Sequence, residues 1–184
     1  MPFEATAFEG LCIFTPEVFY DDRGYFFESY NQQVFAQSGH AIQFVQDNQA
    51  FSKYGVIRGL HYQRPPHAQS KLIRVLRGKI LDVVVDLRPA SATYRKVFTV
   101  ELSEENKKQL FVPRGFAHGY AVLSATAEVL YKCDAFYHPE SEEGVRYDDP
   151  DLHIDWQIPV HQRIISIKDQ RLPWLSQLPV YEIW

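Results

Sequence analysis

Two segments in the first half of the sequence carry side chains suited to acid–base chemistry. Residues 55–63 include Arg58 and His61, and the next such segment begins at Lys71. Side chains alternate between faces in an extended strand, so His61 is expected to share a face with Gln63. A lone histidine is more often a surface or core residue, but burying charged groups without a purpose is costly. Because these segments otherwise resemble core, the pattern favours a base and a cation in one pocket.

A second motif lies at residues 112–120, where a Pro-x-Gly-x-x-His arrangement ends at His118. It resembles the second sequence motif of the cupins, in which that histidine usually binds a metal. The first cupin motif usually supplies His-x-His and a later glutamate. Here Gln63 takes the place of the second histidine, and Lys71 stands where a carboxylate is expected. Two imidazoles beside an ammonium group make a poor divalent-metal site, so the sequence predicts that no metal is bound.

Later segments supply two phenols and a carboxylate. Tyr131 and Tyr137 would share one face of a strand, and they either point at the same ligand or pack as core or rim aromatics. Residues 164–169 resemble an apolar strand that finishes in a charged pair. Its last residue, Asp169, could orient a histidine as the third member of a catalytic triad does. The alternative is a solvated strand end.

Short strands must position these side chains. Three segments rich in β-branched residues are residues 81–87, 97–102 and 128–131. Turns containing glycine separate the strands at short intervals, which is typical of a sandwich, jelly roll or barrel. Asn31 is suited to cap a short helix over residues 31–38, and residues 172–175 are expected to form a helical turn or to pack over a barrel end. The sequence therefore predicts an all-β protein with a few short helices, but not its strand order.

Composition narrows the class of protein. Hydrophobic residues make up 46% of the 184 residues and charged residues 23%, which is typical of one soluble globular domain. The net charge of −4 gives no general reason to bind nucleic acid. No apolar run approaches the roughly 20 residues of a membrane helix, and the first residues do not resemble a signal peptide. Cys12 and Cys133 are too few for a disulfide framework, so a cytoplasmic location is expected.

Taken together, these segments closely resemble the dTDP-4-dehydrorhamnose 3,5-epimerase family of sugar-nucleotide epimerases within the cupin superfamily. The matching stretches are residues 22–28, 45–48, 58–63, 82–88, 113–119, 131–133 and 166–169. They follow one another in order along nearly the whole chain. One departure is at Arg95 and Val97, where the family usually has Gly and Trp. The resemblance implies a cupin-type jelly-roll β-barrel over residues 1–184, with the C-terminal tail packed on it.

The resemblance also implies a mechanism. The substrate would be dTDP-4-dehydro-6-deoxy-D-glucose, whose C4 ketone acidifies the protons at C3 and C5. By resemblance His61 is the base, Asp169 orients His61, Tyr131 is the acid on the opposite face, and Lys71 stabilises the enolate. The product would be dTDP-4-dehydro-L-rhamnose, an intermediate of dTDP-L-rhamnose biosynthesis. The ketone serves as the electron sink, so no cofactor is expected.

Further residues map onto the family's contacts with the nucleotide sugar. They are Arg23, Glu28, Gln46, Asp47, Asn48, Arg58, Lys71, His118, Tyr137, Glu142 and Lys168. Cations suit the diphosphate, and the flat phenol of Tyr137 suits stacking on thymine. The resemblance further implies a homodimer that exchanges N-terminal strands, in which the segment with Arg23 and Glu28 contributes to the partner's pocket.

Three other functions fit some of these residues. A related cupin that epimerises only C3 or only C5 of a dTDP-4-keto-sugar could share all of them. A metal-dependent cupin oxygenase or isomerase is supported only by His61 together with His118. A non-catalytic sugar-binding cupin explains the aromatic residues, but it does not explain a base, an acid and a cation together.

Overall fold

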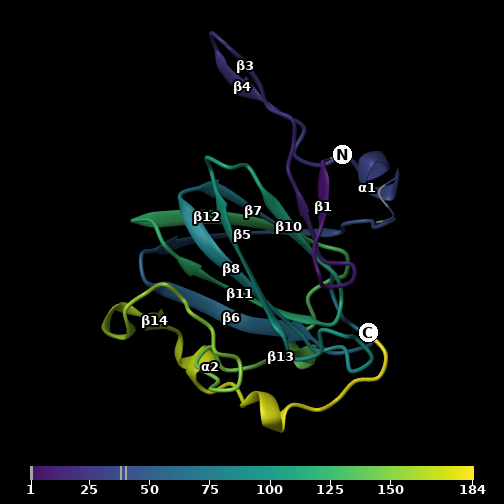
Figure 1. Ribbon diagram of the computed structural model, residues 1–184, viewed down its shortest axis with the longest axis vertical. Coiled ribbons are helices and arrows are strands. Elements are labelled where there is room, and N and C mark those ends of the chain that lie inside the picture. Colours follow the sequence, from purple (N-terminus) through teal and green to yellow (C-terminus); the bar gives the residue numbers. More distant parts are fainter. Residues whose placement is uncertain (1, 38, 40) are drawn as a thin grey trace.

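The computed structural model describes residues 2–37, 39 and 41–184, and within them two β-sheets face each other (Figure 1). One sheet has the order β1-β2-β10-β7-β12-β5, and the other has the order β13-β6-β11-β8-β9 with β14 paired to β6. A separate hairpin consists of β3 and β4. The strands are β1 Phe3–Ala5, β2 Cys12–Phe14, β3 Phe19–Asp21, β4 Gly24–Phe26, β5 Gln46–Lys53, β6 Val56–Gln63, β7 Lys71–Arg77, β8 Lys79–Asp86, β9 Val97–Ser103, β10 Gln109–Val112, β11 Phe116–Val122, β12 Thr126–Cys133, β13 Glu142–Gly144 and β14 Ile164–Ile165.

Helices are short and lie outside the two sheets (Figure 1). They are α1 Gln32–Gln37, α2 Ile167–Gln170 and the 3-10 turns Pro139–Ser141, Val160–Gln162 and Leu175–Gln177. The expected all-β jelly roll with a few short peripheral and C-terminal helices is confirmed. Hydrogen bonding does not join the two sheets into a closed barrel, and β5 and β9 are sheet edges among the described residues. None of the helices in the described ranges is long and apolar enough to span a membrane.

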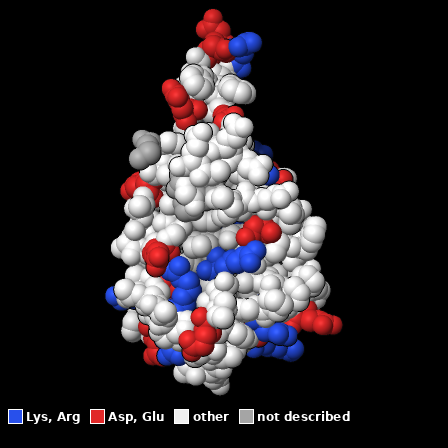
Figure 2. Space-filling model, turned by 90° about the vertical axis from the view of Figure 1, so that its right-hand side faces the viewer, with Lys and Arg blue, Asp and Glu red and all other residues white. Residues whose placement is uncertain are grey.

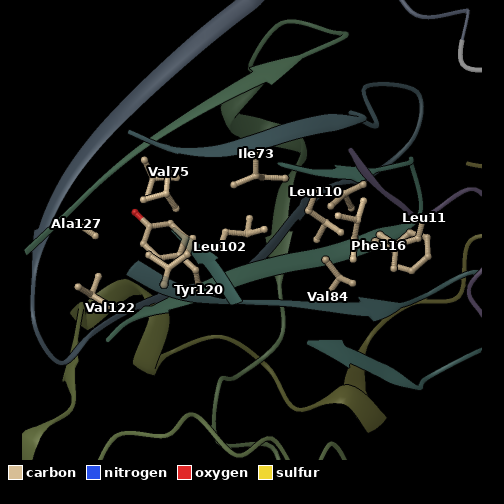
Figure 3. Packing of buried hydrophobic residues seen from close by; sticks show 14 of the residues in the cluster. Leu11, Ile73, Val75, Val84, Leu102, Leu110, Phe116, Tyr120, Val122 and Ala127 are labelled. Atoms are coloured by element: carbon tan, nitrogen blue, oxygen red, sulfur yellow. The ribbon is translucent and has the colours of Figure 1, made fainter. Parts of the chain in front are cut away.

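The main core fills the space between the sheets (Figure 3). The sequence of β8 is a nearly unbroken apolar run because both faces of the strand are buried. Ile80 and Val84 lie in the main core between the sheets, whereas Leu81 and Val83 pack in a second cluster. That second cluster includes C-terminal residues, among them the fully buried Trp156. Because both faces of β8 are covered, the alternation of apolar and polar residues expected for a half-exposed strand is lost. Residues of the C-terminal tail, such as Leu175 and Trp184, also belong to this second cluster or pack against it.

The structure agrees with the predicted start of the helix after Asn31 but not with the whole of the strand predicted at residues 164–169. Asn31 accepts a hydrogen bond from the Gln33 amide at 2.9 Å, as expected of a helix cap, and α1 follows. The predicted end of this helix, Ser38, lies outside the described residues. The predicted strand at residues 164–169 is wrong beyond Ile165. Ser166 caps α2 by accepting from the Asp169 amide at 3.0 Å, and this local hydrogen bond competes with strand extension.

The hairpin β3–β4 stands away from the two sheets (Figures 1 and 2). Its aromatic side chains are exposed, including Tyr20 at 72% and Phe26 at 71%. Charged side chains of both signs gather at its tip, where Arg23 pairs with Asp21 (Figure 2). Large apolar groups in a projecting two-stranded hairpin are a feature of contact surfaces rather than of a free surface.

Arg95 departs from the family pattern at a position with unusual backbone geometry. Its φ is 62°, within the left-handed region that favours glycine. Glycine adopts this conformation without strain, whereas arginine adopts it at a cost on the order of 1 kcal/mol. Arg95 lies in the loop before β9, where its amide donates to the Asp86 carbonyl at 2.7 Å.

Candidate active site

A cavity of about 490 Å³ opens between the two sheets and is lined by half of the predicted site residues. His61 and His118 enter it from one sheet, on β6 and β11, whereas Lys71 and Tyr131 enter from the other, on β7 and β12. A second cavity of about 330 Å³ shares His61, Lys71 and Tyr131 with it. The two cavities therefore form one cleft around these three side chains.

A β-bulge in β6 brings Arg58 into the same cavity as His61. In the pairing with β11, His61 lies opposite His118 and Arg58 lies opposite Tyr120, so three steps along β6 match two along β11. Residues three apart in a regular strand would point to opposite faces. The extra residue on β6 returns Arg58 to the same face as His61. Both Arg58 and His61 line the cavity as a result. The strict alternation assumed from the sequence therefore does not hold here.

Glycine is required at the centre of this bulge. Gly59 has a φ of 111°, and a Cβ at this position would lie 2.7 Å from the Cα of Gly119 and 2.7 Å from the His118 carbonyl oxygen. Those atoms belong to the backbone of β11 and cannot move aside as a flexible side chain could. The close approach of two glycines thus lets β6 and β11 stay paired across the irregularity, and it sets the position of His61.

His61 is held by a carboxylate from α2. Its Nε2 lies 2.8 Å from Oδ1 of Asp169, whose side chain is 5% exposed. Burial raises the pKa of Asp169, but hydrogen bonding and the charge of His61 outweigh it, and with the Gly59 amide they hold the pKa below its ordinary value. Since an ionised carboxylate only accepts hydrogen bonds, Nε2 carries the proton, and Nδ1 is the basic nitrogen.

Tyr131 reaches the cleft from the sheet opposite His61. Burial, followed by the proximity of Cys133 and Tyr120, raises the pKa of the Tyr131 phenol to about 12. The hydroxyl is therefore protonated at neutral pH and able to donate. Its ring packs against the inner core, which fixes where the hydroxyl points.

Lys71 lines both cavities of the cleft. Burial lowers the pKa of its ammonium group, whereas Cys133, Asp82 and Glu142 favour the charged form. Within the described residues, no carboxylate forms an ion pair with its Nζ. An anionic ligand in the cleft would therefore meet a lysine that is not already paired with a carboxylate.

The second cavity gathers polar groups around Glu142. The Tyr137 hydroxyl donates to Oε2 of Glu142, and Lys168 Nζ lies 2.6 Å from the same oxygen. Burial raises the pKa of Glu142, but these two hydrogen bonds hold it below its ordinary value. The Tyr137 amide donates to Oε1 of Gln46 at 2.9 Å, and Asn48 lies beside Gln46 on the same face of β5. This cluster suits recognition of a polar ligand.

Three predicted contact residues lie outside the cleft of this chain. Asp47 is on the opposite face of β5 from Gln46, where its carboxylate pairs with Lys132 at 3.0 Å. Alternation along β5 explains why three consecutive residues cannot all face one ligand. Arg23 is at the tip of the projecting hairpin, and Glu28 is exposed in the segment that follows it.

Sequence reasoning did not assign roles to three residues that support the site. Gln63 donates to the His67 carbonyl at 2.6 Å and accepts from the His138 amide at 2.6 Å, so it ties together the two loops beside the second cavity. Ser52 accepts from Nε of Arg58 at 3.0 Å. Asp82 is fully buried and contacts His118. The one signal for Asp82 was a charge inside an apolar run, which is costly unless the carboxylate has a partner.

Each of the two cleft histidines is engaged by its own carboxylate. Asp169 contacts His61, and Asp82 contacts His118. Among the residues that the structure describes, no three His, Cys, Asp or Glu side chains are grouped so that they could hold a metal ion. The site geometry is therefore that of two separate hydrogen-bonded pairs.

Comparison with known proteins shows the family of this chain. A family model described as dTDP-4-dehydrorhamnose 3,5-epimerase matches residues 5–177. The chain belongs to this family. The epimerase of Methanothermobacter thermautotrophicus is 48% identical over 180 residues, which is 97% of each chain.

Solved structures of this epimerase family share the fold over nearly the whole chain. The dTDP-4-dehydrorhamnose 3,5-epimerase of Elizabethkingia anophelis is 49% identical, with a TM-score of 0.92 and coverage of 97% of this chain and 98% of that one. The 3,5-epimerase of Legionella pneumophila, solved with dTDP-4-keto-L-rhamnose, is 43% identical, with a TM-score of 0.92 and coverage of 96% and 94%. The resemblance inferred from the sequence motifs is confirmed.

Proposed function

We propose that this protein epimerises C3 and C5 of dTDP-4-dehydro-6-deoxy-D-glucose to give dTDP-4-dehydro-L-rhamnose. The observation that carries this proposal is the placement of His61 and Tyr131 on facing sheets of one cleft. Inversion at carbon needs a base on one face of the sugar ring and an acid on the other. The Legionella relative, with dTDP-4-keto-L-rhamnose bound, supports the class of ligand.

His61 starts the reaction as the general base. Its Nδ1 takes the proton from the carbon next to the ketone, and the electrons of the broken C–H bond move onto the C4 oxygen. Asp169, hydrogen-bonded at Nε2, fixes the ring and favours the imidazolium that forms. Lys71 stabilises the negative charge that develops on the enolate oxygen.

Tyr131 completes each inversion from the opposite face. Its hydroxyl gives a proton to the carbon, the C4 ketone re-forms, and the tyrosinate and imidazolium then exchange protons with solvent. The substrate is isomerised with no net gain or loss of atoms, so the chemistry needs neither an oxidant nor a cofactor. Each carbon next to the ketone passes through the same cycle.

The remaining cleft residues would bind the nucleotide sugar. Arg58, His118 and Lys168 supply cations or hydrogen-bond donors for the diphosphate and sugar oxygens. Gln46, Asn48 and Glu142 supply polar contacts, and Tyr137 would stack on thymine. We place the reaction in dTDP-L-rhamnose biosynthesis and in the cytoplasm, a reducing compartment that suits a chain with two cysteines.

Proton NMR of the keto-sugar nucleotide in deuterated water tests the proposal directly. The purified protein is expected to replace the protons at both C3 and C5 with deuterium and to form the L-rhamno product. Exchange and inversion at one carbon alone would instead identify a single-site epimerase. Binding without exchange at either carbon would identify a sugar-binding protein.

Replacing Asp169 with asparagine should give a milder form of the defect caused by loss of His61. The amide occupies the same space, but it does not carry the charge that favours the imidazolium. We expect kcat to fall by roughly 10- to 100-fold, since hydrogen bonds to charged groups are among the stronger ones. Steady-state kinetics would measure this change, with the exposed Asp155→Asn as a control. A kcat equal to that of the wild type would contradict the orienting role.

Activity should not depend on added metal, because Gln63 and Lys71 occupy positions where metal-binding cupins have ligands. The Gln63 side chain is instead hydrogen-bonded to the two flanking loops, at 2.6 Å to the His67 carbonyl and at 2.6 Å to the His138 amide. Extensive dialysis against a chelator is expected to leave turnover unchanged. Loss of turnover that one particular divalent ion restores would point to a metal-dependent cupin.

We also propose a homodimer in which Arg23 and Glu28 reach the partner's cleft. The projecting hairpin, with exposed Tyr20 and Phe26, supports such a contact. Sedimentation equilibrium should therefore show a dimer at micromolar concentration. A monomer alone would contradict this proposal.

Mixing two inactive variants tests the shared site more sharply. If Arg23 acts in the partner's cleft, unfolding and refolding Arg23→Ala together with His61→Asn creates heterodimers with one intact site. Activity should then recover to about a quarter of the wild-type level, as random pairing of two chains predicts. No recovery, despite heterodimer formation, would place Arg23 outside the partner's site.

A further inference from the structure

A second histidine–carboxylate pair lies at the inner end of the cleft, and the proposed acid–base steps do not use it. Nε2 of His118 lies 2.9 Å from Oδ1 and 3.0 Å from Oδ2 of Asp82. His118 lines the larger cavity, whereas the Asp82 side chain has no exposed surface. His118 is therefore open to a ligand in the cleft, whereas Asp82 lies behind it.

The strand register explains how the pair forms. On β8, Asp82 lies opposite Tyr120 of β11, and the next residue on the same face, Val84, lies opposite His118. The carboxylate thus reaches diagonally across two paired strands to the imidazole. His118 is also directly opposite His61 in the pairing of β11 with β6, so both imidazoles start from neighbouring backbone positions.

Asp82 differs from the other fully buried carboxylate of the same strand. Asp86 accepts hydrogen bonds from Arg88, Ser91 and Thr93, all outside the cleft. Among the described residues, Asp82 has only His118 as a hydrogen-bond partner of its side chain. A carboxylate buried in the inner core is costly unless its charge is balanced. His118 is the group placed to balance it.

The negative charge of Asp82 also interacts with Lys71, which lies on the facing sheet. Burial lowers the pKa of the Lys71 ammonium, and Asp82 is one of three groups whose charge favours its protonated form. Another of the three, Glu142, already pairs with Lys168 at 2.6 Å. Asp82 therefore lies where it can influence two of the groups that face the substrate.

We propose that Asp82 is a positioning residue of the reaction, which holds His118 with Nε2 protonated and Nδ1 available to the substrate. This inference rests on the proposed function. A carboxylate only accepts, so the proton of the hydrogen bond resides on Nε2. His118 then presents Nδ1 in a fixed orientation to the keto-sugar nucleotide, beside Lys71.

Replacing Asp82 with asparagine tests the inference, because the shape is kept and the charge is lost. The asparagine amide can donate to Nε2, which reverses the tautomer that His118 adopts. We expect kcat to fall by roughly 10- to 100-fold, as for loss of one oriented hydrogen bond to the substrate. Affinity for dTDP, measured by calorimetry, should change less than threefold, because thymine and most diphosphate contacts remain.

Asp86→Asn is the matched control: it lies on the same strand, is equally buried and contacts no residue of the cleft. It should lower the melting temperature but leave kcat unchanged. If Asp82→Asn does not fold, His118→Gln and the double variant still test the pair, since removing both partners leaves neither one unpaired. The kcat loss of the double variant should be far smaller than the product of the losses expected for the single changes.

The inference would be overturned by a kcat of Asp82→Asn within twofold of the wild type. It would also be overturned if the double variant lost about 10-fold or more beyond His118→Gln, because Asp82 would then act independently of His118. Wild-type protein assayed in parallel separates this outcome from failure of the proposed function. A wild type that exchanges neither C3 nor C5 proton argues against the epimerase activity itself, whereas normal wild-type turnover with a normal Asp82→Asn variant argues only against the role of Asp82.

Discussion

Replacing His61 with asparagine is expected to abolish both epimerisation and exchange of the C3 and C5 protons with solvent. Without the imidazole of His61 the proposed base is missing, so no enolate should form. General bases typically contribute about 10²- to 10⁴-fold to a rate. Because Asp169 would be left with its buried carboxylate beside an amide, some loss of stability should accompany the loss of activity.

Proton NMR in deuterated water measures both losses in one experiment. The exposed His161→Asn serves as a control and should exchange at the wild-type rate. If His61→Asn still exchanges both protons at the wild-type rate, another base acts, and His118 is the first candidate to test. Its position opposite His61 in the β6–β11 pairing puts it in the same cleft.

Replacing Tyr131 with phenylalanine should separate proton exchange from inversion. His61 can still form the enolate, and deuterium can return from the His61 side, so exchange without inversion is expected at the position that is deprotonated first. Epimerisation should fall by about 10²- to 10⁴-fold, the usual contribution of a general acid. The phenyl ring keeps the packing of Tyr131 against the inner core, so the fold should be little affected.

Comparing the rate of deuterium incorporation with the rate of product formation decides the outcome. In the wild type the two rates should be similar, and in Tyr131→Phe exchange should be much the faster. Tyr147→Phe, outside the cleft, controls for loss of a phenol elsewhere. Equal loss of exchange and inversion in Tyr131→Phe would mean that Tyr131 is needed to form the enolate and is not only the acid of the second step.

The pattern of residue types in the sequence was sufficient to predict the class of fold and a polar pocket that holds a base and a cation. β-branched segments separated by glycine turns have few stable arrangements other than stacked antiparallel sheets, which hide their apolar faces. His61, Lys71 and His118 in otherwise apolar strands indicated a buried polar pocket, because charge is not buried without a partner. The structure places these three side chains, with Tyr131, in one cleft.

The partners of these residues depended on the tertiary structure. The bulge at Gly59 brings Arg58 to the face of His61, and it depends on contact with Gly119 from a strand some 60 residues away. Asp169 reaches His61 from a capped helical turn, although the apolar pattern of residues 164–169 predicted a strand. Periodicity describes one element at a time, so it carries no information on such contacts.

Two further features that the sequence did not predict, the direction of Asp47 and the pairing of Asp82 with His118, have the same physical origin. Asp47 faces away from Gln46 because consecutive residues of β5 alternate, whereas a motif compared along the sequence treats neighbours alike. Asp82 and His118 meet only because β8 and β11 pair in one register, which the inner and outer clusters of apolar residues on β8 determine. The sequence by itself determined which groups could do chemistry, and the register between distant strands decided which of them meet, because pairing energy depends on both strands at once.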